Sequence, residues 1–311
     1  MANRDHHYVP QFFLGGFTPS GNKRDKLWES DLSTGMQRLK TPKQVAKRSN
    51  LYRVSVPGLD PEAVEQGLSK IETAAAPLVK QVAQSTSLPN DSKERQTLFY
   101  FIGLLVVRNP SERSGVRTFR EILRDEVATP ETWEVARRRR GLPEDYVTYD
   151  ELKQAVETES NQHTYVLVMI NAAEIMARVL LSRTWRVVTS SAGRLVCSDR
   201  PAVFIENAPR GRILTSSDAP SEAAVVVVPL TRYVALVGKC GNGRDSTGAL
   251  SYTGIAKLNN CTVRNADRYI FSAQDDFVWF AKDGSLHTGM SDLGDERGSD
   301  DEPSPSVFEP M

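Results

Sequence analysis

Residues 224–237 read Ala-Val-Val-Val-Val-Pro-Leu-Thr-Arg-Tyr-Val-Ala-Leu-Val, and this stretch decides the fold class. It contains two short, β-branched apolar runs, 224–228 and 232–237, separated by a Pro-containing segment, which is typical of successive β-strands. Similar runs nearby make residues 183–282 strand-rich, and we predict a mainly antiparallel sheet there. The other strands predicted in this region cover 185–189, 194–197, 202–205 and 268–272, with one helix at 258–267.

The preceding region, residues 57–182, has the pattern of helices. Apolar residues recur every three or four positions between Val64 and Val82, as on the buried face of an amphipathic helix. The longest apolar run covers only 98–107, about half of what a membrane-spanning helix needs, and therefore predicts a buried helix. The predicted helices cover 62–83, a segment from Asp91 through the apolar run, 113–127, 131–149 and 150–181.

The opening unit, residues 1–56, has mixed structure. We predict a short helix that starts at Pro10 and stops at Gly15 and Gly16, then a β-hairpin formed by 26–30 and 36–40. A second short helix is expected from Pro42 through Arg48, and a short strand at 50–54. Helices grouped before strands indicate an α+β fold: a mixed N-terminal hairpin unit, a central helical region and a C-terminal mainly antiparallel sheet.

Domain organisation follows from composition. Residues 1–282 are predicted to form a single α+β domain, divided into 1–56, 57–182 and 183–282. Residues 283–311 are rich in Asp, Glu and Pro and poor in apolar side chains, so we predict an acidic disordered tail.

The chain has 39 Lys and Arg against 39 Asp and Glu, which gives no global field to attract a polyanion and leaves room for a local basic patch. Its three cysteines are widely spaced and fit a reduced compartment. The N-terminus lacks the pattern of a signal peptide. We therefore expect a cytoplasmic protein without a membrane segment.

The most distinctive polar segment begins with His6 and His7, next to Asp5. Imidazole titrates near neutral pH and binds transition metals, so these side chains are candidate catalytic bases, and His7 is a candidate metal ligand. The alternative is a structural segment that packs through Tyr8, Phe12 and Phe13.

Other polar residues lie at the ends of predicted elements. Arg108, at the end of the apolar helix, either binds a phosphate-bearing ligand together with Arg113 or pairs internally with Glu72 or Asp199. Asp199 and Ser198 follow a strand, where Asp199 either acts in catalysis and metal binding or forms a turn. Glu72 is either a metal ligand or an ion-pair partner. Asn50 is expected first as a turn residue, and a substrate-binding role is the alternative.

A basic run at 137–140 is flanked by acids and lacks interleaved aromatic residues, which favours a solvated helix face over a nucleic-acid patch. The chain also lacks the phosphate-loop, dinucleotide-binding and zinc-protease motifs.

The segment His-His-Tyr-Val-Pro-Gln-Phe-Phe-Leu-Gly-Gly-Phe at 6–17 resembles the opening motif of a bacterial family known as domain of unknown function 4238. The resemblance extends over about residues 5 to 272 and implies that the polar motifs form one site, without implying a reaction. One departure is Arg200, where the family pattern more often has Asn. Further matching segments are the hairpin around Trp28, 50–52, 71–72, 108–113, 197–201 and 228–231.

Two functions remain open from the sequence. The first is a metal-assisted hydrolase acting on a phosphodiester or nucleic acid: His6, His7, Arg108 and Asp199 would be catalytic, with a divalent ion on His7, Glu72 and Asp199. Asn50, Arg113 and Ser198 would contact the substrate, a nucleic acid or other phosphate-bearing ligand. The second is a non-enzymatic binding protein in which the same His, Arg and Asp motifs are structural.

Overall fold

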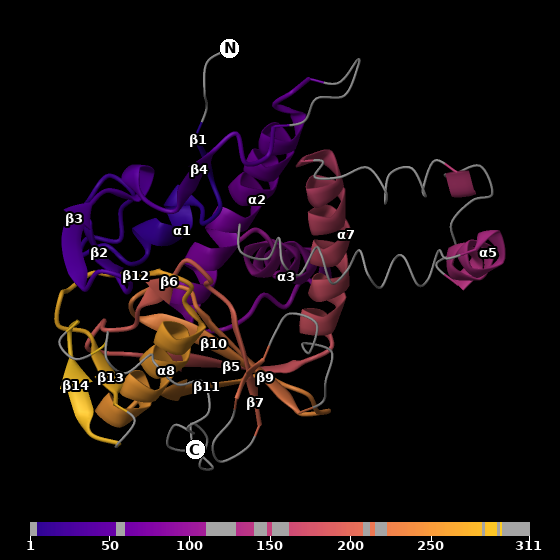
Figure 1. Ribbon diagram of the computed structural model, residues 1–311. Coiled ribbons are helices and arrows are strands. Elements are labelled where there is room, and N and C mark those ends of the chain that lie inside the picture. The colour runs from indigo at the N-terminus through magenta and orange to yellow at the C-terminus, as the bar shows by residue number, and fades with distance from the viewer. Residues whose placement is uncertain are drawn as a thin grey trace.

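The computed structural model describes residues 5–53, 60–109, 129–139, 148–150, 162–207, 212–214, 223–281, 284–290 and 293. Within them the chain has the α+β fold predicted from the sequence (Figure 1). The described helices are α1 (Gln11–Gly15), α2 (Ala63–Ser85), α3 (Ser92–Val107), α5 (Pro130–Arg139), α7 (Gln162–Leu181) and α8 (Tyr252–Asn265), with a 3-10 turn at Pro42–Gln44.

The largest sheet has six strands in the order β11-β5-β10-β9-β7-β8, and only β11 and β5 run parallel. The predicted strands at 224–228 and 232–237 are its central pair, and Val226 lies opposite Gly238. The mainly antiparallel sheet is therefore confirmed. Its strands are β5 (Thr184–Thr189), β7 (Val203–Glu206), β8 (Ile213–Leu214), β9 (Ala224–Pro229), β10 (Val234–Lys239) and β11 (Ser246–Ala249).

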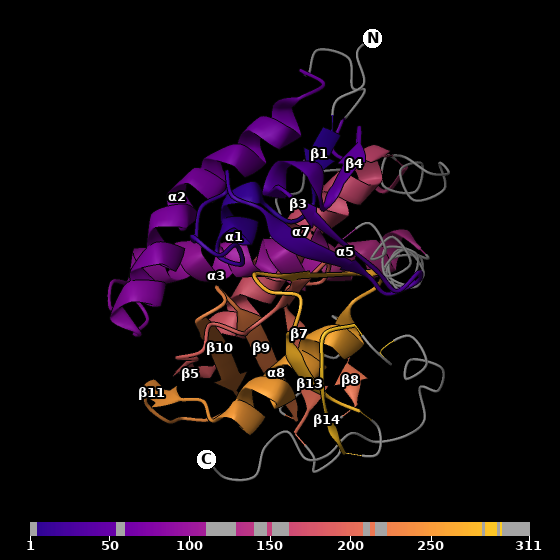
Figure 2. The same ribbon diagram turned by 90° about the vertical axis from the view of Figure 1, so that its left-hand side faces the viewer.

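Both faces of this sheet are covered, which explains the unbroken apolar run of β9. Val226 and Val228 point into a core shared with α3 and α7, and Phe99 of α3 stacks on Trp185 of β5 at 4.8 Å between ring centroids. Val225 and Val227 alternate to the other face and pack against α8. Figures 1 and 2 show the sheet between α8 and the helical layer of α3 and α7.

A second sheet contains strands from the opening unit and from the strand-rich region. It has the order β3-β2-β12-β6, in which β2 (Leu27–Asp31) and β3 (Met36–Lys40) are the predicted hairpin and lie beside β12 (Tyr269–Ser272) and β6 (Cys197–Ser198). The opening unit is therefore part of the same hydrogen-bonded structure as the strand-rich region.

The segment after the hairpin differs from the prediction. The helix expected through Arg48 ends at Gln44, and β4 (Lys47–Ser49) pairs instead with β1 (Asp5–His7). The strand expected at 50–54 is a turn over its described residues, because Ala46 and Asn50 adopt left-handed conformations with φ of 50° and 54°. A left-handed conformation fits neither a right-handed helix nor an extended strand, so the helix does not continue through residue 46 and no strand starts at residue 50.

Smaller differences concern other boundaries. Helix α8 begins at Tyr252 rather than at residue 258, because the Ser251 hydroxyl accepts the Gly254 N–H and caps its first turn. The predicted helix at 113–127, and most of the charged segment after Arg139, lie outside the described residues.

The predicted acidic tail begins with ordered structure. Strand β14 (Leu286–Thr288) pairs with β13 (Val278–Phe280), and the Trp279 indole N–H donates to Gly289 O at 2.9 Å. Residues 294–311 lie outside the described part of the chain. None of the helices described is long and apolar enough to cross a membrane.

Candidate functional site

The His6 imidazole is buried and hydrogen-bonded at both nitrogens. It lies on β1, is 2% exposed, and stacks on Tyr52 with 5.7 Å between ring centroids. The backbone N–H of Tyr52 donates to His6 Nδ1 at 2.8 Å. Because Nδ1 accepts a hydrogen bond, the ring proton is assigned to Nε2, which lies 3.2 Å from Glu62 Oε2. Neither nitrogen has a lone pair free for a substrate or a metal.

The neighbouring His7 points to the other face of β1 and is half-buried. Its Nε2 lies 3.3 Å from Lys43 O, and Gln11 Nε2 lies 3.5 Å from its Nδ1. Burial lowers the pKa of His7, and the positive charges of Lys47 and Arg108 act in the same direction. We therefore expect a neutral imidazole near pH 7.

Arg108 caps the C-terminal end of α3 and is 1% exposed. Its Nη1 donates to Glu72 Oε1 at 2.7 Å and its Nη2 to His7 O at 2.9 Å, while Nε donates to the Tyr52 hydroxyl at 3.3 Å. Burial lowers the pKa of Arg108, but the nearby Tyr52 and Glu72 outweigh it and raise the pKa above its ordinary value. The internal pairing of Arg108 with Glu72, one of the alternatives from the sequence, is present.

Three carboxylates, those of the α2 N-cap residue Glu62 and of Glu65 and Glu72 within α2, lie near His6 and Arg108. Glu62 and Glu72 hold His6 and Arg108, as described above. Between them lies Glu65, whose Oε2 is buried and has no hydrogen-bond partner among the described residues. Burial raises the pKa of Glu65, opposed by the charges of Arg108 and His6. Sequence reasoning missed Glu62 and Glu65, although Glu65 lies seven residues before Glu72 on the same helix face.

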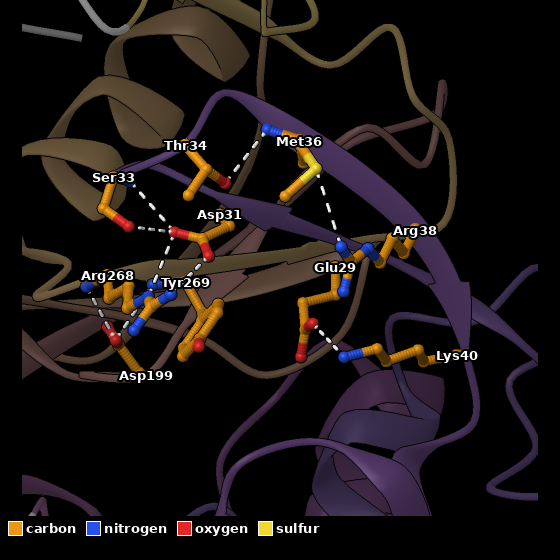
Figure 3. A network of polar contacts seen from close by, with 10 residues as sticks. All are labelled: Glu29, Asp31, Ser33, Thr34, Met36, Arg38, Lys40, Asp199, Arg268 and Tyr269. Atoms are coloured by element: carbon orange, nitrogen blue, oxygen red, sulfur yellow. Dashed lines mark hydrogen bonds and ion pairs between the residues drawn. The ribbon is translucent and has the colours of Figure 1, made fainter.

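Asp199 is buried against the backbone between α8 and β12. Its Oδ1 accepts the Asp267 N–H at 2.9 Å. Its Oδ2 accepts the N–H groups of Arg268 at 2.8 Å and Tyr269 at 2.9 Å, and Figure 3 shows these residues beside Asp199. Burial raises the pKa of Asp199 to about 6, and the three N–H donors act in the opposite direction. Both carboxylate oxygens therefore stabilise this connection.

Three segments that are distant in the sequence meet through these residues. Arg108 donates to His7 O, and the side chain of the next residue, Asn109, donates to Asp199 O at 2.8 Å. Tyr8 lies near Asp199, whose charge adds to burial in raising the Tyr8 pKa. We call this set of residues, His7, Tyr8, Arg108, Asn109 and Asp199, the motif junction.

The proposed metal ligands each have a different partner. His7 contacts Lys43 and Gln11, Glu72 binds Arg108, and Asp199 binds backbone N–H groups. Across the described parts of the chain, no group of three or more His, Cys, Asp or Glu is arranged to hold a metal ion.

The remaining predicted site residues are turn residues or lie elsewhere. The Ser198 hydroxyl donates to Arg200 O at 2.8 Å and accepts the Arg200 N–H at 3.1 Å, which closes a turn. Asn50 occupies the left-handed turn before Tyr52. Arg113 lies outside the described residues. In the basic run, Arg138 is exposed and pairs with Glu134 one helical turn away, as on a solvated face.

The protein therefore has an α+β fold in which three segments meet at the end of α3. Arg108 binds the N-terminal His-His segment there, and Asn109 binds the turn at Asp199. The family model described as protein of unknown function (DUF4238) matches residues 5–276, and the chain belongs to this family. The family resemblance seen in the sequence is thereby confirmed. No curated protein and no solved structure matches the chain.

Proposed function

We propose that the protein acts by binding a partner, and that its His, Arg and Asp motif residues stabilise the fold rather than carry out catalysis. The observation that supports this most directly is the His6 ring, with its Nδ1 accepting the Tyr52 N–H and its Nε2 facing Glu62. A general base must direct a free lone pair at its substrate. His6 has none, and it is 2% exposed.

Arg108 and Asp199 support the same proposal. The guanidinium of Arg108 is 1% exposed, and all three of its nitrogens donate to protein atoms, so almost none of its surface is open to a phosphate. The carboxylate of Asp199 is held by three backbone N–H groups of the same chain. Buried polar groups satisfied in this way fix a unique structure.

Glu65 favours a second candidate function, hydrolysis of a phosphodiester. Its Oε2 is buried and has no hydrogen-bond partner among the described residues, and its pKa is raised. A carboxyl group with these properties can act as a general acid.

One experiment separates the two candidates. The wild-type protein, Glu65→Gln and His6→Ala are incubated with a chromogenic phosphodiester and with DNA in Mg²⁺ or Mn²⁺, and their stability is measured in parallel. We expect no turnover in any sample, and a loss of about 2 kcal/mol in the His6→Ala unfolding free energy because buried partners are left unpaired. Turnover that disappears in Glu65→Gln at unchanged stability would overturn the proposal in favour of the hydrolase.

A further inference from the structure

The charge of the chain is unevenly distributed. Residues 5–53 contain nine Lys and Arg against four Asp and Glu, a net charge of +5, although the whole chain has 39 of each. This unit comprises β1, α1, the β2–β3 hairpin, the 3-10 turn and β4, which lie together at the N-terminal end of the molecule (Figure 1). A chain without net charge therefore has one strongly basic unit.

The four acids of this unit are already engaged. Asp5 pairs with Lys47 at 2.7 Å, and Asp25 accepts the backbone N–H groups of Ser20 and Lys26. Figure 3 shows the other two contacts, Glu29 with Lys40 and Asp31 with Arg268. Three of the four carboxylates are therefore ion-paired, and Asp25 is held by backbone N–H groups.

Six of the nine cations form no ion pair with a described carboxylate. The β2–β3 register places Leu27 opposite Lys40, so Lys26 and Lys43 both lie just beyond the same end of this strand pair. Arg38 lies on β3, which is the edge of its sheet, and its guanidinium donates to the Met36 sulfur at 3.5 Å. The six unpaired cations, all exposed, are Lys23, Arg24, Lys26, Arg38, Lys43 and Arg48.

We propose that this basic unit binds the phosphate backbone of a double-stranded nucleic acid. The inference rests on the proposed binding function and names its partner and surface. When unpaired Lys and Arg side chains neutralise phosphates, the counterions condensed on the nucleic acid are released. This release favours binding regardless of base sequence. The remainder of the chain carries a net charge of −5, which directs the polyanion to this unit.

Two alternatives explain less of the pattern. Cations on edge strands prevent strand addition, which accounts for those on β3 and β4, but Lys23, Arg24, Lys26 and Lys43 lie in loops and in the 3-10 turn. An acidic protein partner needs apolar anchors, yet Met36 and Leu39, the large apolar side chains exposed in this unit, point to opposite faces of β3.

The exposed side chains of residues 5–53 favour a double-stranded over a single-stranded nucleic acid as the partner. Single-stranded nucleic acids are bound by stacking their bases on exposed aromatic rings. Within residues 5–53 as described, no large aromatic side chain is exposed. Recognition therefore reaches phosphates and not bases.

The test is fluorescence anisotropy with the full chain and short duplexes: two unrelated DNA sequences and one RNA. We expect similar affinity for both DNA sequences and a linear fall of log affinity with log salt concentration. Preference for DNA or RNA identifies which duplex is the partner, and either preference supports the surface. Binding of polyglutamate as tight as that of the duplexes, or no salt-dependent duplex binding, would overturn the proposal.

Matched variants locate the surface. Lys26→Gln/Arg38→Gln/Lys43→Gln should weaken binding by roughly tenfold or more and lower the salt slope by about 2 to 3. The control Arg138→Gln/Arg178→Gln/Arg212→Gln removes three exposed cations from other parts of the molecule and should leave binding unchanged. An equal loss in the control would show that net charge, and not this unit, is responsible.

A denaturing gel of the bound duplex, with Mg²⁺ or Mn²⁺ present, separates the two proposals. Intact strands with binding through Lys26, Arg38 and Lys43 support both. Cleaved strands with the same binding reject the non-enzymatic function and keep the surface. Intact strands without binding reject the surface and leave the protein as a binder of another partner.

Discussion

The guanidinium of Arg108 lies 2.7 Å from the carboxylate of Glu72, and this contact joins the end of α3 to α2 beneath the N-terminal His-His segment. Arg108 is 1% exposed, whereas the Glu72 side chain is 24% exposed. The cation cannot lose its proton, so its burial depends on this partner.

Glu72→Gln should lower the unfolding free energy by about 1–3 kcal/mol, because a buried guanidinium loses its counter-charge. The measurement is urea unfolding followed by circular dichroism. A control is Glu174→Gln on α7, whose 2.7 Å pair with Arg178 is exposed on both sides and should change stability by less than about 0.5 kcal/mol. Equal effects of the two substitutions would show that Glu72 is no more than a surface ion-pair partner.

Asp199 should give the fold a distinct pH dependence. Burial raises its pKa from 3.8 to about 6 in the folded protein, so the folded state holds a proton that the unfolded state releases. The unfolding free energy contributed by this group is therefore highest below about pH 4 and falls as pH rises through 6, by as much as about 3 kcal/mol. Denaturant unfolding from pH 4 to 7 measures the slope.

The control for this pH effect is Asp199→Asn, which cannot titrate. The variant should be less stable at every pH, because an amide offers one acceptor oxygen to three N–H donors, and the slope assigned to residue 199 should vanish. If stability instead rises from pH 4 to 6 in the wild type relative to the variant, the three donors outweigh burial.

Gly103 permits α3 and α7 to approach closely. A Cβ at this position would lie 2.7 Å from Ala173 O on α7, so Gly103→Ala should cost about 1–3 kcal/mol through displacement of the two helices. Gly67 in α2 has no described atom within 4 Å of such a Cβ, and Gly67→Ala should stabilise by about 0.5–1 kcal/mol through helix propensity. Opposite signs in the two melting temperatures are expected, and a stabilising Gly103→Ala would contradict the close contact.

Asn259 joins α8 to the segment before β6 and to β13. Its side chain, 1% exposed, accepts the Val196 N–H at 3.1 Å and donates to Arg194 O at 2.8 Å and Val278 O at 2.9 Å. Asn259→Leu leaves three buried backbone groups unpaired and should cost about 3 kcal/mol or more. Hydrogen exchange of the Val196 amide should accelerate in the variant, whereas an unaffected amide would mean that Asn259 does not protect it.

The sequence predicted the elements whose signals are local. The apolar runs of β9 and β10 and the spacing of α2 identified strands and a helix, because side-chain periodicity depends only on neighbouring residues. It did not predict β1, whose three residues pair with β4 about forty positions later. A strand that short has no signal of its own, and its partner was predicted to be helical.

For the candidate site, the sequence identified polar residues but not their partners. It included Glu72 as one of two partners for Arg108, and the 2.7 Å contact selects it. It grouped His7, Glu72 and Asp199 as metal ligands, but each binds a different part of the chain. Residue type restricts which chemistry is available, whereas the direction of each lone pair depends on a backbone brought near by folding.

The sequence by itself determined the fold class, the family and the uneven distribution of charge, since composition and local periodicity are independent of tertiary contacts. Only the tertiary structure decided that His6 accepts a hydrogen bond from Tyr52, that Asp199 binds residues nearly seventy positions away, and that six of the nine cations of the N-terminal unit form no ion pair with a described carboxylate. The reason is physical: burial and hydrogen-bond direction are properties of a three-dimensional arrangement, and they set the availability of each polar atom.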